Sequence, residues 1–388
     1  MGRTRHSLVT AAVLAVGVLG CVGVPPPSAF ELRLDFPGVR VLQPHWRRQV
    51  IDPERRDYRP IERSGAVFDP SRGLVFVGTS QGRFWALESG TGKVVWAHGE
   101  PDGFHSAPLL VDDPGLVVAG NDGGDLLAFE PETGVVRWRV DLGGPVRGGA
   151  SYQDGVVYAR TATQRVFAIE ALSGRELWSF ERPLPEGYVS GSESGVLVSG
   201  DRVYTGFVDG TLAALSGVTG EKLWDINLAT EGHDELVLDD ICATPVEIDG
   251  TLVVSSYDNG LFGIDAAEGG QRWQRPDLVH ACGLAVLEQD ALAAVAGTGL
   301  ARVDALDGVT IWMRRYPAGT QRDPIVHRGL IVVADDIHGL LMFEALTGQL
   351  LQGAWAGAGV AGRPAVLDGR VGVLDNSGEF LSYVLVGG

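Results

Sequence analysis

Few side chains in this sequence have the type and spacing that catalysis or metal binding requires. The eight histidines are scattered, with no HxH or HExxH pattern, so we expect no zinc or copper site. No GxSxG motif, Walker-type loop or Cys/His pair indicates a nucleophile. Acidic residues are abundant, but none are grouped with the spacing of a calcium site. The sequence therefore predicts neither a metal centre nor a catalytic one.

Cys21 is the first of three cysteines, and its surroundings predict lipidation. Residues 1–20 have a short basic start and an apolar run too short to span a membrane, which is the plan of a secretory signal. Residues 18–21, Val-Leu-Gly-Cys, resemble a bacterial lipobox, whose cysteine is lipidated and becomes the mature N-terminus. The alternative is an ordinary signal peptide cleaved nearby. We expect a lipid anchor at Cys21 and a Pro-rich tether over residues 21–38.

Cys242 and Cys282 lie forty residues apart and could form a disulfide. An exported protein meets an oxidising compartment, which permits the bond. The bond also requires Cα atoms roughly 4.4–6.8 Å apart. The alternative is two buried thiols, and the sequence leaves both possibilities open.

The elements that must position these residues form a repeat of about forty residues. Six copies end in a tryptophan with a glycine four residues earlier, and a seventh keeps the glycine but has Gln352 in place of the tryptophan. The six tryptophans are Trp96, Trp138, Trp178, Trp224, Trp273 and Trp312. Each copy contains four short apolar runs joined by Gly, Asp and Ser turns, which predicts four β-strands. Four-stranded units at this period are typical of propeller blades.

The two ends of the chain determine the number of blades. Residues 361–386 supply three strands after the seventh motif, and residues 40–50, which include Trp46, supply one. We therefore predict an all-β fold, an eight-bladed β-propeller over residues 39–388, with the ring closed by the N-terminal strand. Cys242 and Cys282 fall at the same point in the first strands of two successive blades.

Packing explains the repeated motif better than ligand binding does. The glycine provides the positive φ that the turn before the fourth strand requires. The tryptophan can then cover the small residue ten positions earlier, as Trp178 would cover Ala168.

The repeat resembles the tryptophan-docking motif of the quinoprotein-type propellers. That family contains dehydrogenases that use pyrroloquinoline quinone, and BamB-like lipoproteins of the outer-membrane β-barrel assembly machinery. Such dehydrogenases present adjacent cysteines, a calcium site and a catalytic aspartate, usually in a longer chain, and this sequence has no Cys-Cys pair. Eight blades with a lipobox are similar to the BamB-like class, and the resemblance implies a non-enzymatic scaffold without a cofactor.

Two intervals between repeats are longer than the others. Successive tryptophans from Trp96 to Trp312 are 42, 40, 46, 49 and 39 residues apart, and the extra residues fall in 181–195 and 227–241. Both segments join a fourth strand to the next first strand, so they open on one face of the ring. Long loops on a rigid scaffold commonly bind partners. The alternative is that they are only solvated insertions.

In the BamB-like class these two loops contact the barrel insertase BamA. Residues 188–194 keep the Glu and Ser of the L-x-L-R-G-E-S run of that class but lack its Arg, and residues 240–245 keep the Asp, Thr and Pro of D-x-D-T-T-P. The resemblance implies a partner surface in the same place with different chemistry. The predicted partner-binding residues are Tyr188, Glu193, Ser194, Glu235, Asp239 and Asp240.

These features together predict a lipid-anchored protein of the outer membrane that faces the periplasm. Val22, where an Asp would retain the lipoprotein, resembles an outer-membrane sorting signal. The expected partners are a BamA-like insertase and its accessory lipoproteins, whereas a net charge of −18 disfavours nucleic acid. The alternatives are an exported quinoprotein-like dehydrogenase, a ligand-binding propeller, or an adaptor for another envelope complex.

Overall fold

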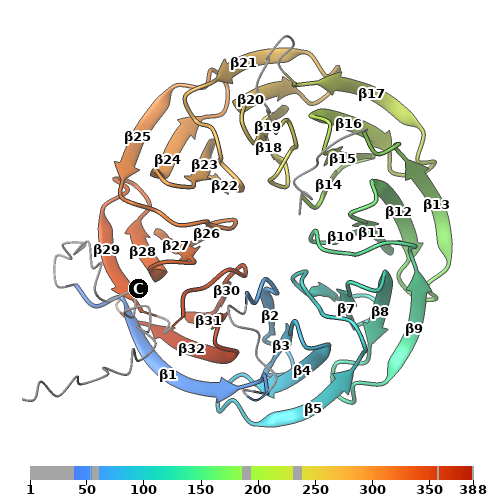
Figure 1. The fold of residues 1–388 in the computed structure, drawn as a ribbon, viewed down its shortest axis with the longest axis vertical. Helices are drawn as coiled ribbons and strands as arrows, with labels where there is room; N and C mark the ends of the chain where they lie inside the picture. Colours follow the sequence, from blue (N-terminus) through green and yellow to red (C-terminus); the bar gives the residue numbers. More distant parts are fainter. Residues whose placement is uncertain are drawn as a thin grey trace, which may run out of the picture. The chain divides into compact units, whose positions relative to one another are not determined.

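Eight four-stranded antiparallel sheets are arranged around a ring in this computed structural model (Figure 1). The structure describes residues 39–52, 54, 61–185, 194–229, 238–355 and 358–386. The predicted all-β fold with eight propeller blades is confirmed. Within the described residues, no helix is long and apolar enough to cross a membrane.

Seven blades are each made of four successive strands. The first four blades contain β2 (Ala66–Asp69), β3 (Leu74–Gly78), β4 (Arg83–Glu88) and β5 (Val94–Gly99); β6 (Leu109–Val111), β7 (Leu116–Gly120), β8 (Asp125–Phe129) and β9 (Val136–Asp141); β10 (Ser151–Gln153), β11 (Val156–Arg160), β12 (Arg165–Glu170) and β13 (Glu176–Glu181); β14 (Val196–Ser199), β15 (Arg202–Gly206), β16 (Thr211–Ser216) and β17 (Lys222–Asn227).

The remaining blades follow the same order until the last one. They contain β18 (Val246–Ile248), β19 (Thr251–Ser256), β20 (Gly260–Asp265) and β21 (Gln271–Arg275); β22 (Gly283–Leu287), β23 (Asp290–Val295), β24 (Gly299–Asp304) and β25 (Thr310–Arg315); β26 (Ile325–His327), β27 (Leu330–Asp335), β28 (Gly339–Glu344) and β29 (Leu350–Ala354); β30 (Ala365–Leu367), β31 (Arg370–Leu374), β32 (Glu379–Leu385) and the N-terminal β1 (Leu42–Gln49).

The N-terminal strand closes the ring, as predicted. β1 pairs antiparallel with β32 and forms the outer strand of the eighth blade, where Figure 1 shows the blue and red ends of the chain meeting. This pairing gives the last sheet a fourth strand, so that all eight blades have the same number of strands. Because the two ends of the chain share one blade, opening the ring would disrupt a complete sheet.

Burial differs between the inner and outer strands of a blade. Every residue of β3 is buried, whereas residues of β5 alternate between half-buried and exposed. The second strand of a blade has neighbouring blades on both faces, so its side chains are enclosed. An outer strand borders solvent, so alternate side chains are exposed.

Each tryptophan of the repeat packs against the turn of the next blade as well as against its own. Trp96 lies opposite Ala86 in the β4–β5 pair, as the predicted cover over a small residue requires. Its indole N–H donates to the Pro131 carbonyl of the next turn at 2.7 Å, and a Cβ placed on Gly134 would meet its ring at 2.6 Å. Gly134 has φ +72°, as predicted for the motif glycine. The motif therefore joins neighbouring blades.

Gln352 replaces this contact where the ring closes. The eighth blade receives its outer strand from the other end of the chain, so it has no continuous turn before that strand. The Gln352 side chain instead accepts hydrogen bonds from the backbone N–H groups of Val41 and Leu42, both at 2.8 Å, and donates one to the Leu42 carbonyl at 3.0 Å. An amide can satisfy backbone donors and an acceptor together, which an indole cannot do. The missing tryptophan is thus explained by ring closure.

Candidate functional site

Two long connections flank the fourth blade, as predicted. The first inter-blade loop runs between the end of β13 at Glu181 and the start of β14 at Val196. The second runs between the end of β17 at Asn227 and the start of β18 at Val246. Three of the predicted partner-binding residues, Tyr188, Glu193 and Glu235, lie outside the described residues, as does the predicted lipidation site Cys21.

The described ends of the two loops are hydrogen-bonded to each other. The Ser194 hydroxyl donates to the Ala243 carbonyl at 3.0 Å. The Gly195 N–H donates to the Thr244 hydroxyl at 2.9 Å. These residues immediately precede the innermost strands of the fourth and fifth blades, so the two loops leave the scaffold side by side.

A buried arginine fixes the base of the first loop. Arg160, at the end of β11, is 2% exposed and donates to the Ser194 carbonyl and to Gln164 Oε1, both at 3.0 Å. Burial lowers the pKa of Arg160 to about 10, and the carboxylate of Asp240 acts in the opposite direction. Asp240 lies at the end of the second loop. The Arg160 guanidinium therefore interacts with both loop bases.

A polar network holds the end of the second loop to the fifth blade. Asp239 accepts a hydrogen bond from the Asn259 amide at 2.8 Å, and its backbone carbonyl accepts one from the Ser256 hydroxyl at 2.8 Å. The Leu238 N–H donates to the Asp258 carboxylate at 2.8 Å. These contacts involve backbone as well as side chains, so the segment from 238 to 240 has a defined conformation.

The start of the first loop is held by Arg182. Its Nε donates to Asp209 at 2.8 Å, and its Nη2 donates to the Thr211 hydroxyl at 2.8 Å. The Phe207 ring lies 5.7 Å from the Arg182 guanidinium carbon and 5.6 Å from that of Arg160. Leu184, two residues further on, is 51% exposed. An apolar side chain is thus presented to solvent next to a rigid ion pair.

The three predicted residues that the structure describes have different environments. Ser194 and Asp240 are buried, at 1% and 2% exposed, whereas Asp239 is half-buried. Ser194 and Asp240 therefore shape the loop bases, and direct contact with a partner is open only to Asp239. Sequence reasoning missed Arg160 and Leu184. Arg160 gave no signal because it ends a strand within an ordinary repeat, but Leu184 is an apolar residue in a proline-rich loop and could have been noticed.

A disulfide joins Cys242 to Cys282 close to these loops, with Cα atoms 5.1 Å apart. The prediction that the two cysteines occupy the same point of their repeats is wrong by one residue. Val246 and Ala285 occupy equivalent places in their blades, where they pair with Val253 and Leu292 of the second strands. Cys242 lies four residues before Val246, whereas Cys282 lies only three residues before Ala285. Successive side chains in a strand point to opposite sides, so the offset allows one side chain to point across to the other blade.

The described residues contain no group of three or more His, Cys, Asp or Glu side chains suited to holding a metal ion. The chemistry that the two loop bases offer is that of a binding surface. They present rigid backbone, one half-buried carboxylate and one exposed leucine.

Comparisons with known proteins agree with this architecture. A family described as "Outer membrane protein assembly factor BamB" matches residues 91–292. The BamB protein of Nitrosomonas eutropha is 25% identical over 60% of this chain and 55% of its own length. That of Shewanella oneidensis is 23% identical over 81% of this chain and 82% of its own. The crystal structure of BamB from Moraxella catarrhalis superposes with a TM-score of 0.74 at 19% identity, covering 89% of this chain and 100% of the other.

The sequences of quinoprotein dehydrogenases match shorter segments, although the crystal structure of the quinohemoprotein alcohol dehydrogenase of Comamonas testosteroni covers 89% of this chain and 77% of its own, with a TM-score of 0.67 at 13% identity. The quinoprotein alcohol dehydrogenase PedH of Pseudomonas putida is 30% identical, but over only 36% of this chain and 25% of its own. A shared propeller repeat accounts for such a partial match, because the repeat motif is common to both classes.

Proposed function

This chain belongs to the family of the outer membrane protein assembly factor BamB, and we propose that it is a non-enzymatic scaffold of the machinery that assembles β-barrel proteins in the outer membrane. It would hold a BamA-like barrel insertase and work beside the accessory lipoproteins of that complex. The observation that carries the proposal is the family match over residues 91–292, which spans the second to fifth blades and both long loops.

The partner surface that we propose consists of the two inter-blade loops beside the fourth blade. Its described part comprises Leu184 and Asp239, on loop bases that are fixed by Arg182, Arg160 and the bonds between the loops. A rigid base reduces the entropy that a loop loses when it binds. An exposed leucine can supply the apolar anchor of an interface, and the half-buried carboxylate can supply specificity.

The N-terminal segment would attach this scaffold to the membrane. We propose that residues 1–20 are removed, that Cys21 is lipidated, and that residues 21–38 tether a propeller that begins at residue 39. This arrangement would place the protein in the periplasm at the inner face of the outer membrane. Mass spectrometry of the mature protein tests it, since an N-terminus other than acylated Cys21 would contradict the anchor.

The partner surface can be tested by capture with the periplasmic domains of a BamA-like insertase. We expect Leu184→Asp combined with Asp239→Lys to weaken binding about tenfold or more, because burying a leucine contributes about 1.5–3 kcal/mol. Asp240 should not be altered in this test, because it is buried and a charge reversal there would disturb the fold.

The matched control is Leu346→Asp, since Leu346 is 70% exposed but lies in the seventh blade. This variant should bind as the parent does. Equal binding by the double variant and the parent would reject the loop surface. No binding by the parent itself would reject the insertase as partner.

A further inference from the structure

A cavity of about 470 Å³ lies at the centre of the propeller. Its lining comes from the residues around the first strand of every blade, so it occupies the axis of the ring. Small residues, among them Gly65, Ala107 and Gly149, line part of its wall. A Cβ added to Gly149 would meet no atom within 4 Å, so this part of the wall faces open space. The volume is in the range of small-molecule sites.

The lining is cationic although the whole chain is strongly acidic. Among the described residues that form it are four arginines and one carboxylate, that of Asp323, while a second carboxylate, that of Asp122, forms an ion pair with Arg147. The arginines are Arg63, Arg147, Arg322 and Arg363, and each lies two to four residues before the first strand of a different blade. The chain as a whole has a net charge of −18. Arginines thus outnumber carboxylates at this cavity, whereas acidic residues outnumber basic ones in the chain as a whole.

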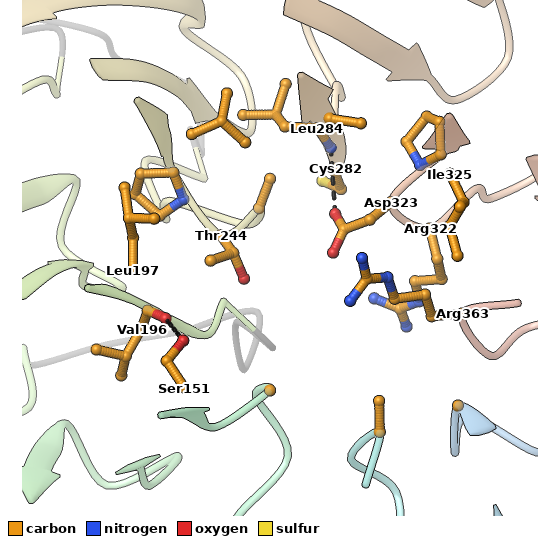
Figure 2. A pocket seen from close by; sticks show the side chains of 18 of the residues that line it. Ser151, Val196, Leu197, Thr244, Cys282, Leu284, Arg322, Asp323, Ile325 and Arg363 are labelled. Atoms are coloured by element: carbon orange, nitrogen blue, oxygen red, sulfur yellow. Dashed lines mark hydrogen bonds between the residues drawn. The ribbon is translucent and has the colours of Figure 1, made fainter. Parts of the chain in front are cut away.

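Contacts with the scaffold orient two of these arginines. The Arg147 guanidinium donates two hydrogen bonds to Asp122, at 3.0 and 3.2 Å, and Nε of Arg322 donates to the Ala361 carbonyl at 3.2 Å. A guanidinium has five N–H donors in a rigid plane, so these bonds fix its direction. Figure 2 shows Arg322, Asp323 and Arg363 together on one side of the cavity, with Val196 and Leu197 on the other.

Asp323 partly offsets this positive charge. Its carboxylate accepts the Leu284 N–H at 3.1 Å. Burial raises the pKa of the Asp323 carboxyl, while the nearby Arg363 and Arg322 act in the opposite direction. Asp323 is thus a buried carboxyl that lies close to two of the four arginines.

We propose that the central cavity binds a small multivalent oxyanion of the polycarboxylate or polyphosphate class. The arginines approach from four separate blades, so an anion with two or more charged groups can contact more of them than a single carboxylate can. Guanidinium groups pair with carboxylate and phosphate oxygens through charge-assisted hydrogen bonds. This site is separate from the two-loop surface, and the proposal does not depend on the assembly role.

Calorimetric titration of the full lipidated chain in detergent, at constant ionic strength, tests the proposal with citrate and with inorganic pyrophosphate. We expect saturable binding of one equivalent of at least one of these anions. Binding of citrate alone assigns the polycarboxylate class, and binding of pyrophosphate alone assigns the polyphosphate class. Saturable binding of neither would overturn the proposal.

Three variants locate the bound anion. Arg363→Gln should weaken binding about tenfold or more, because a hydrogen bond to a charged group contributes about 1.5–3 kcal/mol. Asp323→Asn should strengthen binding, because it removes the opposing charge. Gly149→Phe should abolish binding by filling the cavity. If this variant fails to fold, Arg363→Gln and Asp323→Asn still test the proposal, because they should change the affinity in opposite directions. Arg175→Gln is the control, since Arg175 pairs with Glu170 beside the turn between β12 and β13 and is not among the residues that line the cavity. An affinity that is equal in the parent, Arg363→Gln and Gly149→Phe would overturn the proposal.

Discussion

At the scale of single residues, Asp335 is a buried carboxylate whose bonds outweigh the cost of its burial. Its side chain is fully buried. It accepts hydrogen bonds from the backbone N–H groups of Gly319, Ile337 and His338, each at 2.9 Å, and one from the Gln321 amide at 3.1 Å. Burial raises the pKa of the Asp335 carboxyl. Hydrogen bonds from the side chain and backbone of His338 and from the backbone of Ile337 lower this pKa by more than burial raises it, so it lies below the ordinary value of 3.8. The charged carboxylate is therefore stabilised by the fold.

We expect Asp335→Asn to reduce the free energy of unfolding by about 2–3 kcal/mol at neutral pH, because an amide cannot accept on both of its heavy atoms. A carboxyl whose pKa is lowered in the folded state stabilises the fold above its unfolded value of 3.8, and this contribution is lost as pH falls through the folded pKa. Urea unfolding at pH 7 and at about pH 3 should show the gap between parent and variant narrowing. Asp201→Asn, at a side chain that is 88% exposed, is the control and should have no effect. A gap that is the same at both pH values would contradict this account.

At the scale of elements, the turn before each outer strand joins one blade to the next. Gly308 has φ +76°, and a Cβ on it would lie 2.8 Å from the Trp273 ring of the preceding blade. The Trp273 indole N–H also donates to the Ala305 carbonyl in the same turn, at 2.9 Å. The glycine is thus required both by its backbone conformation and by the ring that lies against it.

A pair of glycine variants separates these two requirements. Gly329 has the same φ of +76° but no atom within 4 Å of its added Cβ. We expect Gly329→Ala to cost about 1–2 kcal/mol from backbone strain. Gly308→Ala should cost about 1–3 kcal/mol more, because its methyl group collides with the indole. Chemical unfolding followed by circular dichroism measures both, and equal losses would show that the docked tryptophan contributes nothing to the glycine requirement.

At the scale of the whole molecule, two long-range links strengthen the ring. Gln352 attaches the seventh blade to the start of β1, and the Cys242–Cys282 disulfide joins the fifth blade to the sixth. Both cysteines line the central cavity, and Cys242 lies near the end of the second loop. The disulfide therefore joins, near the axis, two blades that Trp273 already joins through the turn between β24 and β25.

We expect the double variant Cys242→Ser, Cys282→Ser to lose about 3–4 kcal/mol of stability, because the disulfide closes a loop of 40 residues in the unfolded chain. The parent should lose a similar amount when a reductant is added, whereas the double variant should not respond. Thermal unfolding with and without reductant measures both effects. If the parent does not respond to reductant and both thiols are alkylated in the native protein, the bond is absent.

Much of the scaffold could be read from local pattern, because each blade repeats the same spacing of glycine, small residue and tryptophan. The conformation of Gly134 and the pairing of Trp96 with Ala86 both follow from that spacing. The contact of Trp96 with the next blade does not follow from it, since residues 96 and 131 meet only after two sheets have stacked.

The sequence by itself determined the number of blades, the closing strand and the places where long loops interrupt the repeat, because these depend on spacing along the chain. Only the tertiary structure decided which residues near those loops are buried and which face solvent. Ser194 and Asp240 resembled surface residues in the sequence, but they are enclosed beside Arg160, which comes from another strand. The cationic cavity likewise exists only because four arginines, from positions 63 to 363, are brought to one axis by closure of the ring. Burial and charge depend on neighbours in space, and a repeat of forty residues does not specify those neighbours.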